Sequence, residues 1–216
     1  MDRISKQIND IFDFLKFNKS EKVTEMMTKY IELLFSWHKT HNIIGTKDPI
    51  YFIKRDIFDS IAMCKHLPDG KLLDVGTGGG IPGLIIAMVK KNSRVVLLDK
   101  KEKPIRFLEQ IRLKLEIKNI DIVHESYEKF KDKKDISAIV LKNFSNKTIS
   151  KMSYKDKVLA ITSIARTNLG TNLPVYFLTG SNALSLKNQT KKNNISLKKI
   201  ETPFFEKNRF LVESLT

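Results

Sequence analysis

A glycine-rich stretch, KLLDVGTGGGIPGL at residues 71–84, constrains the fold of this chain more than any other feature. It consists of a short apolar strand with an acid, Asp74, at its carboxyl end, then a glycine-rich turn and the start of an apolar helix. Glycine is needed in such a turn because a Cβ would disfavour positive φ angles and hold the backbone away from a ligand. The free N–H groups at the start of the helix can also bind that ligand. The stretch therefore predicts a strand that leads into a ligand-binding turn.

The acids near this turn help to distinguish its ligand, because nucleotides, phosphates and S-adenosylmethionine (SAM) all bind to turns of this kind. Asp74 lies two residues before the first glycine, where a dinucleotide-binding turn usually has an apolar residue and a methyltransferase turn has a carboxylate. Asp99 follows the apolar strand at 94–98 and can accept hydrogen bonds from both hydroxyls of a ribose. Both acids favour SAM. A GxGxxG pattern at 78–83 keeps NAD as an alternative, and an ordinary tight turn is a third interpretation.

The length and composition favour an intracellular protein with one main core. The 216 residues suffice for one domain with an added helical segment. A single cysteine, Cys64, excludes an internal disulfide framework and is compatible with a reducing cytoplasm. The first residues, MDRISKQINDIFDF, lack the apolar core of a signal peptide, and no run reaches the ~20 apolar residues of a membrane helix. We expect a cytoplasmic monomer with no membrane partner and no metal.

The net charge has two interpretations. A formal charge of +15 and a pI of about 9.7 suggest a polyanionic partner, because lysine and arginine neutralise phosphates. The excess is mostly lysine and accompanies abundant asparagine and isoleucine, which coding-sequence base composition alone could produce. Charge therefore indicates nucleic-acid binding only together with other features.

Residues 1–68 predict a helical N-terminal cap. Apolar residues recur at helical spacing in the ranges 4–15, 20–38 and 48–67, with a turn-like break at 41–46. On the third of these helices, the pair Asp59-Ser60 could frame the mouth of the glycine turn, although a solvated helical face is the commoner position for such a pair.

Residues 69–216 predict the domain that carries the site. Strands are expected at 71–75, 94–98, 120–123, 136–141 and 175–178, with helices at 82–90, from 104 and at 155–168. This alternation predicts an α/β fold with a mostly parallel sheet, which binds ligands beyond the carboxyl ends of its strands. The extended pieces 197–203 and 209–215 predict a hairpin that adds an antiparallel C-terminal strand, as in Rossmann-like SAM methyltransferases. The lysine-rich stretch 187–199 is expected to be the least structured part, with its charges in solvent.

The chemistry of methyl transfer limits the acceptor. Transfer from a sulfonium is an in-line displacement, so the protein mainly holds donor and acceptor in near-attack geometry. Candidate bases are few: His124 falls at a strand end, near the ligand or on the surface, and Cys64 is more consistent with an inert core thiol than with a nucleophile. The end of the fourth strand, LKNF at 141–144, lacks the proline pair typical of exocyclic amino methyltransferases. An acceptor with a free lone pair, such as guanine N7, fits best.

The residues between about 30 and 145 carry a family resemblance. The chain resembles the ribosomal small-subunit methyltransferase G family, also called glucose-inhibited division protein B, in the runs NIIGTKDP from 42, RDIFDSI at 55–61, DVGTGGGIPG at 74–83, LLDKKEKPIRFLEQI at 97–111 and HESYEKF at 124–130. The resemblance implies that the protein uses SAM to methylate N7 of a guanine in small-subunit (16S) ribosomal RNA. Its expected partner is therefore that RNA or the small ribosomal subunit.

The resemblance also implies site residues. It places SAM contacts on Gly76, Ile81, Asp99, Tyr127, Glu128 and the residue that ends the fourth strand, Lys142, and the turn adds Asp74, Gly78 and Gly80. We expect Lys142 to bind the SAM carboxylate or an RNA phosphate. We expect Phe144 to stack on the target base or the adenine, with a plain core position as the alternative. These two are the predicted catalytic residues.

Three positions depart from the family pattern on the substrate side. The usual arginine at the fourth strand end is Lys142, a histidine of the third helix is Asp56, and a lysine after the fifth strand is Thr179. Lysine keeps the charge of arginine but loses its planar fork. These departures leave two alternatives open: methylation of another acceptor, or a SAM-binding, RNA-associated protein with reduced catalysis.

Overall fold

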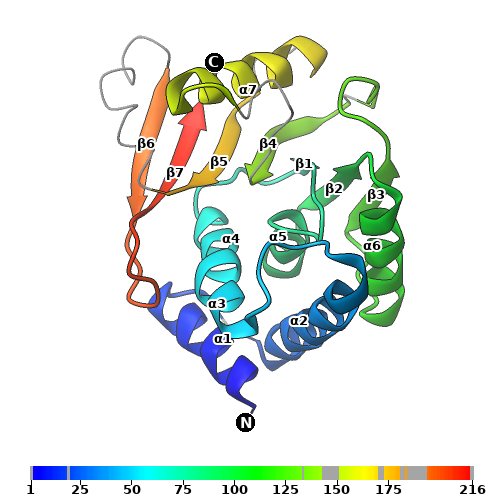
Figure 1. The fold of residues 1–216 in the computed structure, drawn as a ribbon, viewed down its shortest axis with the longest axis vertical. Helices are drawn as coiled ribbons and strands as arrows, with labels where there is room; N and C mark the ends of the chain where they lie inside the picture. The colour runs from blue at the N-terminus through cyan, green and yellow to red at the C-terminus, as the bar shows by residue number, and fades with distance from the viewer. Residues whose placement is uncertain are drawn as a thin grey trace.

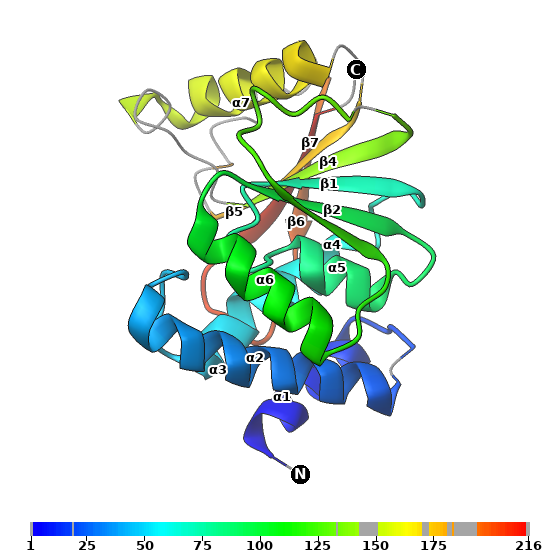
Figure 2. The same cartoon turned by 90° about the vertical axis from the view of Figure 1, so that its right-hand side faces the viewer.

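The computed structural model describes residues 2–18, 20–132, 134–142, 151–169, 173–180, 183 and 194–214. A central sheet separates two helical layers of unequal thickness (Figures 1 and 2). Helix α7 covers one face of the sheet, and α4, α5 and α6 cover the other face, with α1 and α2 outside them. This arrangement confirms the predicted α/β fold.

The N-terminal helices form where the apolar spacing predicts them. Their bounds are α1 Arg3–Phe14, α2 Glu21–His41, α3 Pro49–Phe52, a π-helical turn η1 Ile53–Ile57, and α4 Phe58–Met63. The Ser20 hydroxyl caps α2 by accepting the N–H of Val23 at 3.2 Å. Asn42, with φ at 50°, ends the same helix in the left-handed conformation. The helix predicted at 48–67 is thus one helical segment that contains a π turn.

The sheet has seven strands in the order β3-β2-β1-β4-β5-β7-β6. The strands are β1 Lys71–Val75, β2 Arg94–Asp99, β3 Ile120–His124, β4 Ile136–Lys142, β5 Val175–Thr179, β6 Ile195–Ile200 and β7 Arg209–Ser214, and the helices between them are α5 Gly83–Val89, α6 Glu102–Lys114 and α7 Tyr154–Leu169. Strands β1 to β5 are parallel, whereas β7 runs antiparallel to both β5 and β6. The predicted antiparallel C-terminal strand is therefore confirmed.

One prediction about the C-terminal region is wrong in part. Strand β6 begins at Ile195, inside the stretch 187–199 that was expected to be least structured. Ile195 is buried because its side chain belongs to the core between the sheet and α7, while Lys198 and Lys199 are exposed as expected. Residues 187–193 lie outside the described residues.

Alternate residues of the strands build two separate cores, because successive side chains point to opposite faces. Leu72 and Val95 belong to the core shared with the N-terminal helices, and Leu73 and Val96 belong to the core covered by Val158 of α7. The cap helices and one face of the sheet thus share one continuous core, and a domain boundary at residue 68 stays a prediction. Within the described ranges, every helix is too short or too polar to cross a lipid bilayer.

Candidate active site

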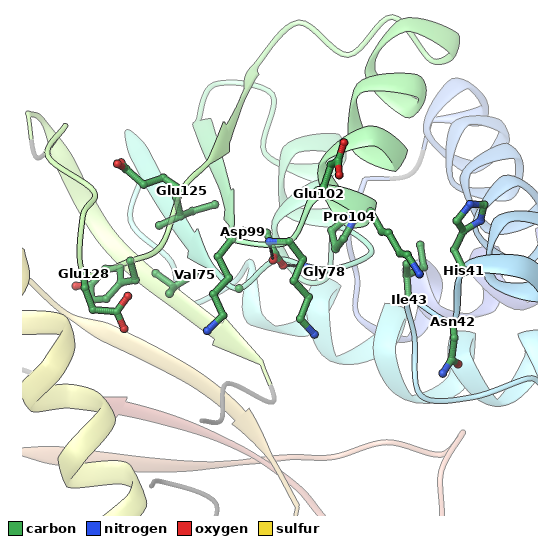
Figure 3. Close-up of a pocket in the computed structure, with 16 residues that line it drawn as sticks. His41, Asn42, Ile43, Val75, Gly78, Asp99, Glu102, Pro104, Glu125 and Glu128 are labelled. Atoms are coloured by element: carbon green, nitrogen blue, oxygen red, sulfur yellow. Dashed lines mark hydrogen bonds between the residues drawn. The ribbon is translucent and has the colours of Figure 1, made fainter. Parts of the chain in front are cut away.

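A cleft of about 870 Å³ opens at the carboxyl ends of the parallel strands, where the sheet topology predicts a ligand. Its lining residues are His41, Asn42, Ile43, Val75, Gly76, Gly78, the run from Leu98 to Pro104, Glu125, Tyr127 and Glu128. Figure 3 shows Asn42 and Ile43 on the opposite side of the cleft from Glu128, with Gly78 and Asp99 between them. The wall therefore combines the glycine turn, the β2–α6 loop, the loop after β3 and the end of α2.

The glycine turn is held against the neighbouring strand by its backbone. The N–H groups of Gly76 and Thr77 both donate to the carbonyl oxygen of Leu98, at 2.8 and 3.1 Å. Gly78 has a φ of 55°, in the region that favours glycine. The turn consequently presents backbone, with no side chain, to the cleft at this position.

Asp99 links the turn to the next loop. Its Oδ2 accepts the N–H of Gly78 at 2.9 Å, and its Oδ1 accepts the N–H of Lys101 at 2.9 Å. The carboxylate lines the cleft although Asp99 is only 8% exposed. An ionised carboxylate has about four acceptor positions, so both oxygens can still accept a hydroxyl each. The carboxylate is thus fixed in place and keeps the capacity to bind a ribose diol.

Asp74 lies behind the turn and supports it. Its Oδ2 accepts the N–H of Gly83 at 2.8 Å, and a Cβ on Gly83 would come within 2.6 Å of this oxygen. Glycine is therefore required at position 83 for close packing of α5 on β1. Burial raises the pKa of Asp74 to about 7, against the lowering effects of Thr77 and the Gly83 N–H. Among the described residues, Asp74 Oδ1 and Thr77 Oγ1 are both buried and have no hydrogen-bond partner of normal geometry.

The helical cap also holds the turn. The Tyr30 hydroxyl of α2 donates to the carbonyl oxygen of Gly79 at 2.7 Å, and this hydrogen bond is buried. A Cβ on Gly79 would lie 3.0 Å from Leu34 and 3.1 Å from Ile44. The cap and the glycine turn are thus in close contact at Gly79.

The structure divides the predicted cofactor residues into two groups. Gly76, Gly78, Asp99, Tyr127 and Glu128 line the cleft. The remaining predicted residues, Asp74, Gly80, Ile81 and Lys142, are not part of its lining. Phe144 lies outside the described residues.

Lys142 has an ion-pair partner on the cap. Its Nζ donates to Asp56 Oδ1, and the two side chains are only 4% and 5% exposed. The role of Lys142 as an anchor for the SAM carboxylate or an RNA phosphate stays a prediction. Two of the three substrate-side departures, Asp56 and Lys142, are therefore in direct contact.

Asp59 is not on a solvated face, and the alternative that favoured such a position is wrong. The side chain is fully buried, and both carboxylate oxygens accept hydrogen bonds from Arg209 Nε, at 3.2 and 2.9 Å. The reason is that β7 brings a guanidinium to this point, a contact across 150 residues. Ser60 is buried too, and its hydroxyl donates to the Asp56 carbonyl oxygen at 2.6 Å.

Cys64 and His124 both lie outside the cleft lining. Cys64 is buried, and burial raises the pKa of its thiol to about 12, as expected for an inert core cysteine. His124 is exposed and does not line the cleft, and its ring lies 3.2 Å from the carbonyl oxygen of Lys100. His124 therefore has the surface position.

Part of the cleft is formed by residues that the sequence patterns did not predict. The segment Lys100–Lys103 directly follows Asp99, so its position after a strand end was a usable signal. His41, Asn42 and Ile43 lie in the turn-like break after α2, and only the packing of the cap on the turn brings them to the cleft.

The fold is shared with one class of solved proteins, the methyltransferases. The structure superposes on a ribosomal protein L11 methylase from Lactobacillus delbrueckii subsp. bulgaricus with a TM-score of 0.53 at 15% identity, covering 80% of this chain and 81% of that one. It superposes on a SAM dependent methyltransferase from Aquifex aeolicus with a TM-score of 0.52 at 16% identity, covering 78% and 93%.

Within this class, the chain belongs to the rRNA small subunit methyltransferase G family, whose model matches residues 23–208. A Ribosomal RNA small subunit methyltransferase G from Vibrio campbellii is 30% identical over 148 residues, which are 68% of this chain and 70% of the relative. A protein of the same name from Acinetobacter baylyi is 40% identical over 114 residues, 53% and 54% of the two chains. The matched part thus spans between about half and 70% of these relatives' lengths.

The residues of the cleft fit SAM. Asp99 offers fixed acceptors to a ribose, and the turn at Gly76 and Gly78 lets a ligand approach the backbone closely. The cleft volume of about 870 Å³ is within the ~300–1,000 Å³ range of small-molecule sites. SAM is therefore the cofactor expected from both the family and the geometry.

Proposed function

We propose that this protein transfers the methyl group of SAM to N7 of a guanine in small-subunit ribosomal RNA. The observation that carries the proposal is the Asp99 carboxylate, fixed by Gly78 and Lys101 at the floor of a cleft, in a chain that belongs to this family. The relatives are named as ribosomal RNA methyltransferases, and we extend that substrate to this chain.

Methyl transfer requires the protein to bind SAM and the guanine and to orient them toward each other. SAM, when bound, supplies an electrophilic methyl on a sulfonium. Asp99 would hold the ribose, and the backbone at Gly76 and Gly78 would set the position of the rest of the cofactor. Guanine N7 attacks with a lone pair and carries no proton, so no side chain has to act as a base. Alignment of N7 with the methyl group then accounts for the catalytic effect.

The mouth of the cleft suits an RNA partner. Lys100, Lys101 and Lys103 line the cleft and are exposed, in a chain with a formal charge of +15. Exposed lysines next to a base-binding cleft would bind the phosphates that flank the target guanine. We place the protein in the cytoplasm, where it would act as a monomer on the RNA or on the small subunit.

A second candidate function has one observation in its favour. Lys142, the residue proposed to anchor SAM or a phosphate, is bound to Asp56. If Asp56 alone compensates the Lys142 charge, so that Lys142 binds no anionic group of the cofactor or the RNA, the protein would bind SAM and RNA with reduced catalysis. Phe144 would stack on the base in the active enzyme.

The two candidates are distinguished by mapping N7-methylguanine in ribosomal RNA from cells with and without the gene. If the proposal is correct, one guanine loses its N7-methyl group when the gene is deleted and regains it when a native copy is supplied. Restoration by an Asp99→Ala copy would be inconsistent with it. Purified protein should transfer labelled methyl from SAM to RNA from the deletion strain, and should not label RNA from native cells. Tight SAM binding without transfer would favour the second candidate.

A further inference from the structure

Two ion pairs join one helical segment of the cap to the carboxyl-end side of the sheet. The segment runs through η1 and α4, and its acids Asp56 and Asp59 are three residues apart. Asp56 pairs with Lys142, the last residue of β4, and Asp59 pairs with Arg209, the first residue of β7. All four side chains are at most 12% exposed. Removal of one partner from such a pair leaves an uncompensated buried charge.

Asp56 is itself held in place from its other side. Its Oδ2 accepts two hydrogen bonds from Arg55, at 3.0 and 2.8 Å, while its Oδ1 accepts from Lys142. Arg55 in turn donates to the Tyr51 hydroxyl at 3.1 Å and lies 4.7 Å from the centre of that ring. This chain of contacts orients Asp56, so that one carboxylate oxygen points to the end of β4.

The end of β4 adjoins the glycine turn. Val140 of β4 pairs in register with Asp74 of β1, so Lys142 and Gly76 are each two residues beyond a paired position. The Lys142 ammonium can donate three hydrogen bonds. Among the described residues, Asp56 is the partner that accepts from it. The pair therefore fixes a cation at the carboxyl edge of the sheet, one strand away from the turn.

We infer that Asp56 is a positioning residue for methyl transfer: it holds the Lys142 ammonium at the end of β4, beside the cofactor turn, so that this charge can bind an anionic group of the cofactor or the RNA. This inference deepens the proposed function and rests on it. Asp59 and Arg209 belong to a second pair that fastens the cap to β7 and has a structural role.

The surrounding charges determine whether Lys142 stays protonated. Burial lowers its pKa, Asp56 and Asp59 raise it, and Arg55 lowers it again. From the sheet, Asp74 also faces this charge, since Lys142 lowers the pKa of Asp74. Two further groups complete the surroundings: Tyr30 of α2, whose pKa is raised by burial and then by Asp56, and Arg209 of β7, which pairs with Asp59. Loss of the Asp56 charge would lower the pKa of Lys142 further, so the ammonium would lose its charge as the pH rises.

The test measures kcat/KM for methyl transfer from pH 6 to pH 9 with native protein, Asp56→Asn and Asp56→Asn/Lys142→Arg. We expect Asp56→Asn to lose about ten- to a hundredfold, because a displaced positioning group has an effect of this order. The loss should grow as the pH rises. The double variant should recover most of the activity and show a flat profile, because arginine stays charged throughout. Asp59→Asn is the matched control: it should lower the melting temperature and change the pH profile less than Asp56→Asn does, because Asp59 pairs with Arg209 and raises the pKa of Lys142 less than Asp56 does.

A native pH profile in Asp56→Asn would overturn the inference. If that variant does not fold, Asp56→Asn/Lys142→Met removes both charges together, which buried pairs tolerate better. A folded double variant with native kcat/KM would also overturn the inference, whereas a folded variant with a loss of about tenfold or more would support it. If native protein transfers no methyl to ribosomal RNA, the proposed function fails. Calorimetric affinities of the same variants for SAM and for a small-subunit RNA fragment then test Asp56: a loss for one ligand shows which of them Lys142 binds, and unchanged affinity for both in all variants would exclude the positioning role.

Discussion

The glycine turn and the buried ion pairs lie at the same edge of the sheet, but the chain builds them in different ways. The turn is made by neighbours in sequence, and its main contacts are backbone N–H groups to Asp74, Leu98 and Asp99. The ion pairs of Asp56 with Lys142 and of Asp59 with Arg209 join residues that are 86 and 150 positions apart. The turn is thus built mainly from residues 74–99, whereas the two buried ion pairs depend on the complete fold.

This difference has an energetic consequence. A backbone-built turn tolerates changes in distant side chains, because its hydrogen bonds come from groups that every residue has. A buried ion pair depends on both partners, because each charge loses its hydration on burial and the attraction of the other charge compensates for that loss.

Asp59→Ala should cause the largest loss of stability. Arg209 would remain 88% buried without its carboxylate, since the native side chain is only 12% exposed. Removal of one member of a buried pair costs about 3–5 kcal/mol in the free energy of unfolding. Urea unfolding of the purified variant measures this loss. The control is Asp121→Ala, which breaks an exposed pair with Arg94 of similar geometry and should cost about 0–1 kcal/mol. Equal losses in the two variants would remove the contrast between buried and exposed pairs.

Asp74→Asn should change the pH dependence of stability. The folded pKa of about 7 is above the usual value of 3.8, so folded protein binds more protons than unfolded protein between these two values. The stability contributed by Asp74 is therefore present below about pH 4 and is lost as the pH rises to about 7, by roughly 1.4 kcal/mol per pH unit. The free energy of unfolding of native protein should therefore fall, relative to that of the variant, from pH 4.5 through pH 5.5 to pH 6.5. A constant difference across this range would mean that Asp74 is ionised in the folded protein.

Asp99→Ala should weaken SAM binding by about 1–3 kcal/mol, because a fixed acceptor in the cleft is lost. The variant also loses the hydrogen bonds from Gly78 and Lys101, so thermal unfolding should accompany the calorimetry to show that the protein is folded. Asp99→Asn, which keeps the size and one acceptor, should lose less. Unchanged SAM affinity in the alanine variant, or tighter binding of NAD than of SAM by native protein, would contradict the assignment of the ribose site.

Features that depend on local sequence patterns could be predicted from the sequence, whereas the long-range contacts could not. The mostly parallel sheet, the antiparallel C-terminal strand and the cleft residues Gly76, Gly78 and Asp99 could be predicted, because each depends on a local pattern or on a known order of patterns. The family resemblance pointed to the same turn and is confirmed by the match over residues 23–208.

The buried charges could not be predicted in the same way. Asp56 and Asp59 occupy polar positions of a helix, where solvent exposure is the usual outcome. Only the register of β4 and β7 shows that a lysine and an arginine meet them. The contribution of His41 to the cleft also depends on how α2 packs on the turn, which apolar spacing does not specify.

The smallest predicted effect tests whether the turn is as independent of the fold as its backbone contacts suggest. Tyr30 donates its hydroxyl to the Gly79 carbonyl oxygen at 2.7 Å, and this buried bond is a side-chain contact from the cap to the turn. Tyr30→Phe keeps the ring that packs near Phe107 and removes only the donor. The free energy of unfolding should fall by about 1 kcal/mol, because the carbonyl oxygen loses its partner inside the protein.

SAM affinity then shows whether the helical cap also shapes the turn or whether the backbone contacts suffice. The matched control is Tyr176→Phe, which removes a hydroxyl that donates to Glu213 at 2.9 Å, on strands that contribute nothing to the cleft lining. Both variants should lose similar stability, and only Tyr30→Phe should also weaken SAM binding, by about two- to fivefold, which corresponds to less than 1 kcal/mol. Equal SAM affinity in the two variants would show that the backbone contacts with Asp74, Leu98 and Asp99 suffice to shape the turn. A selective loss in Tyr30→Phe would show that the helical cap takes part in cofactor binding through the conformation of Gly79, although Tyr30 does not line the cleft.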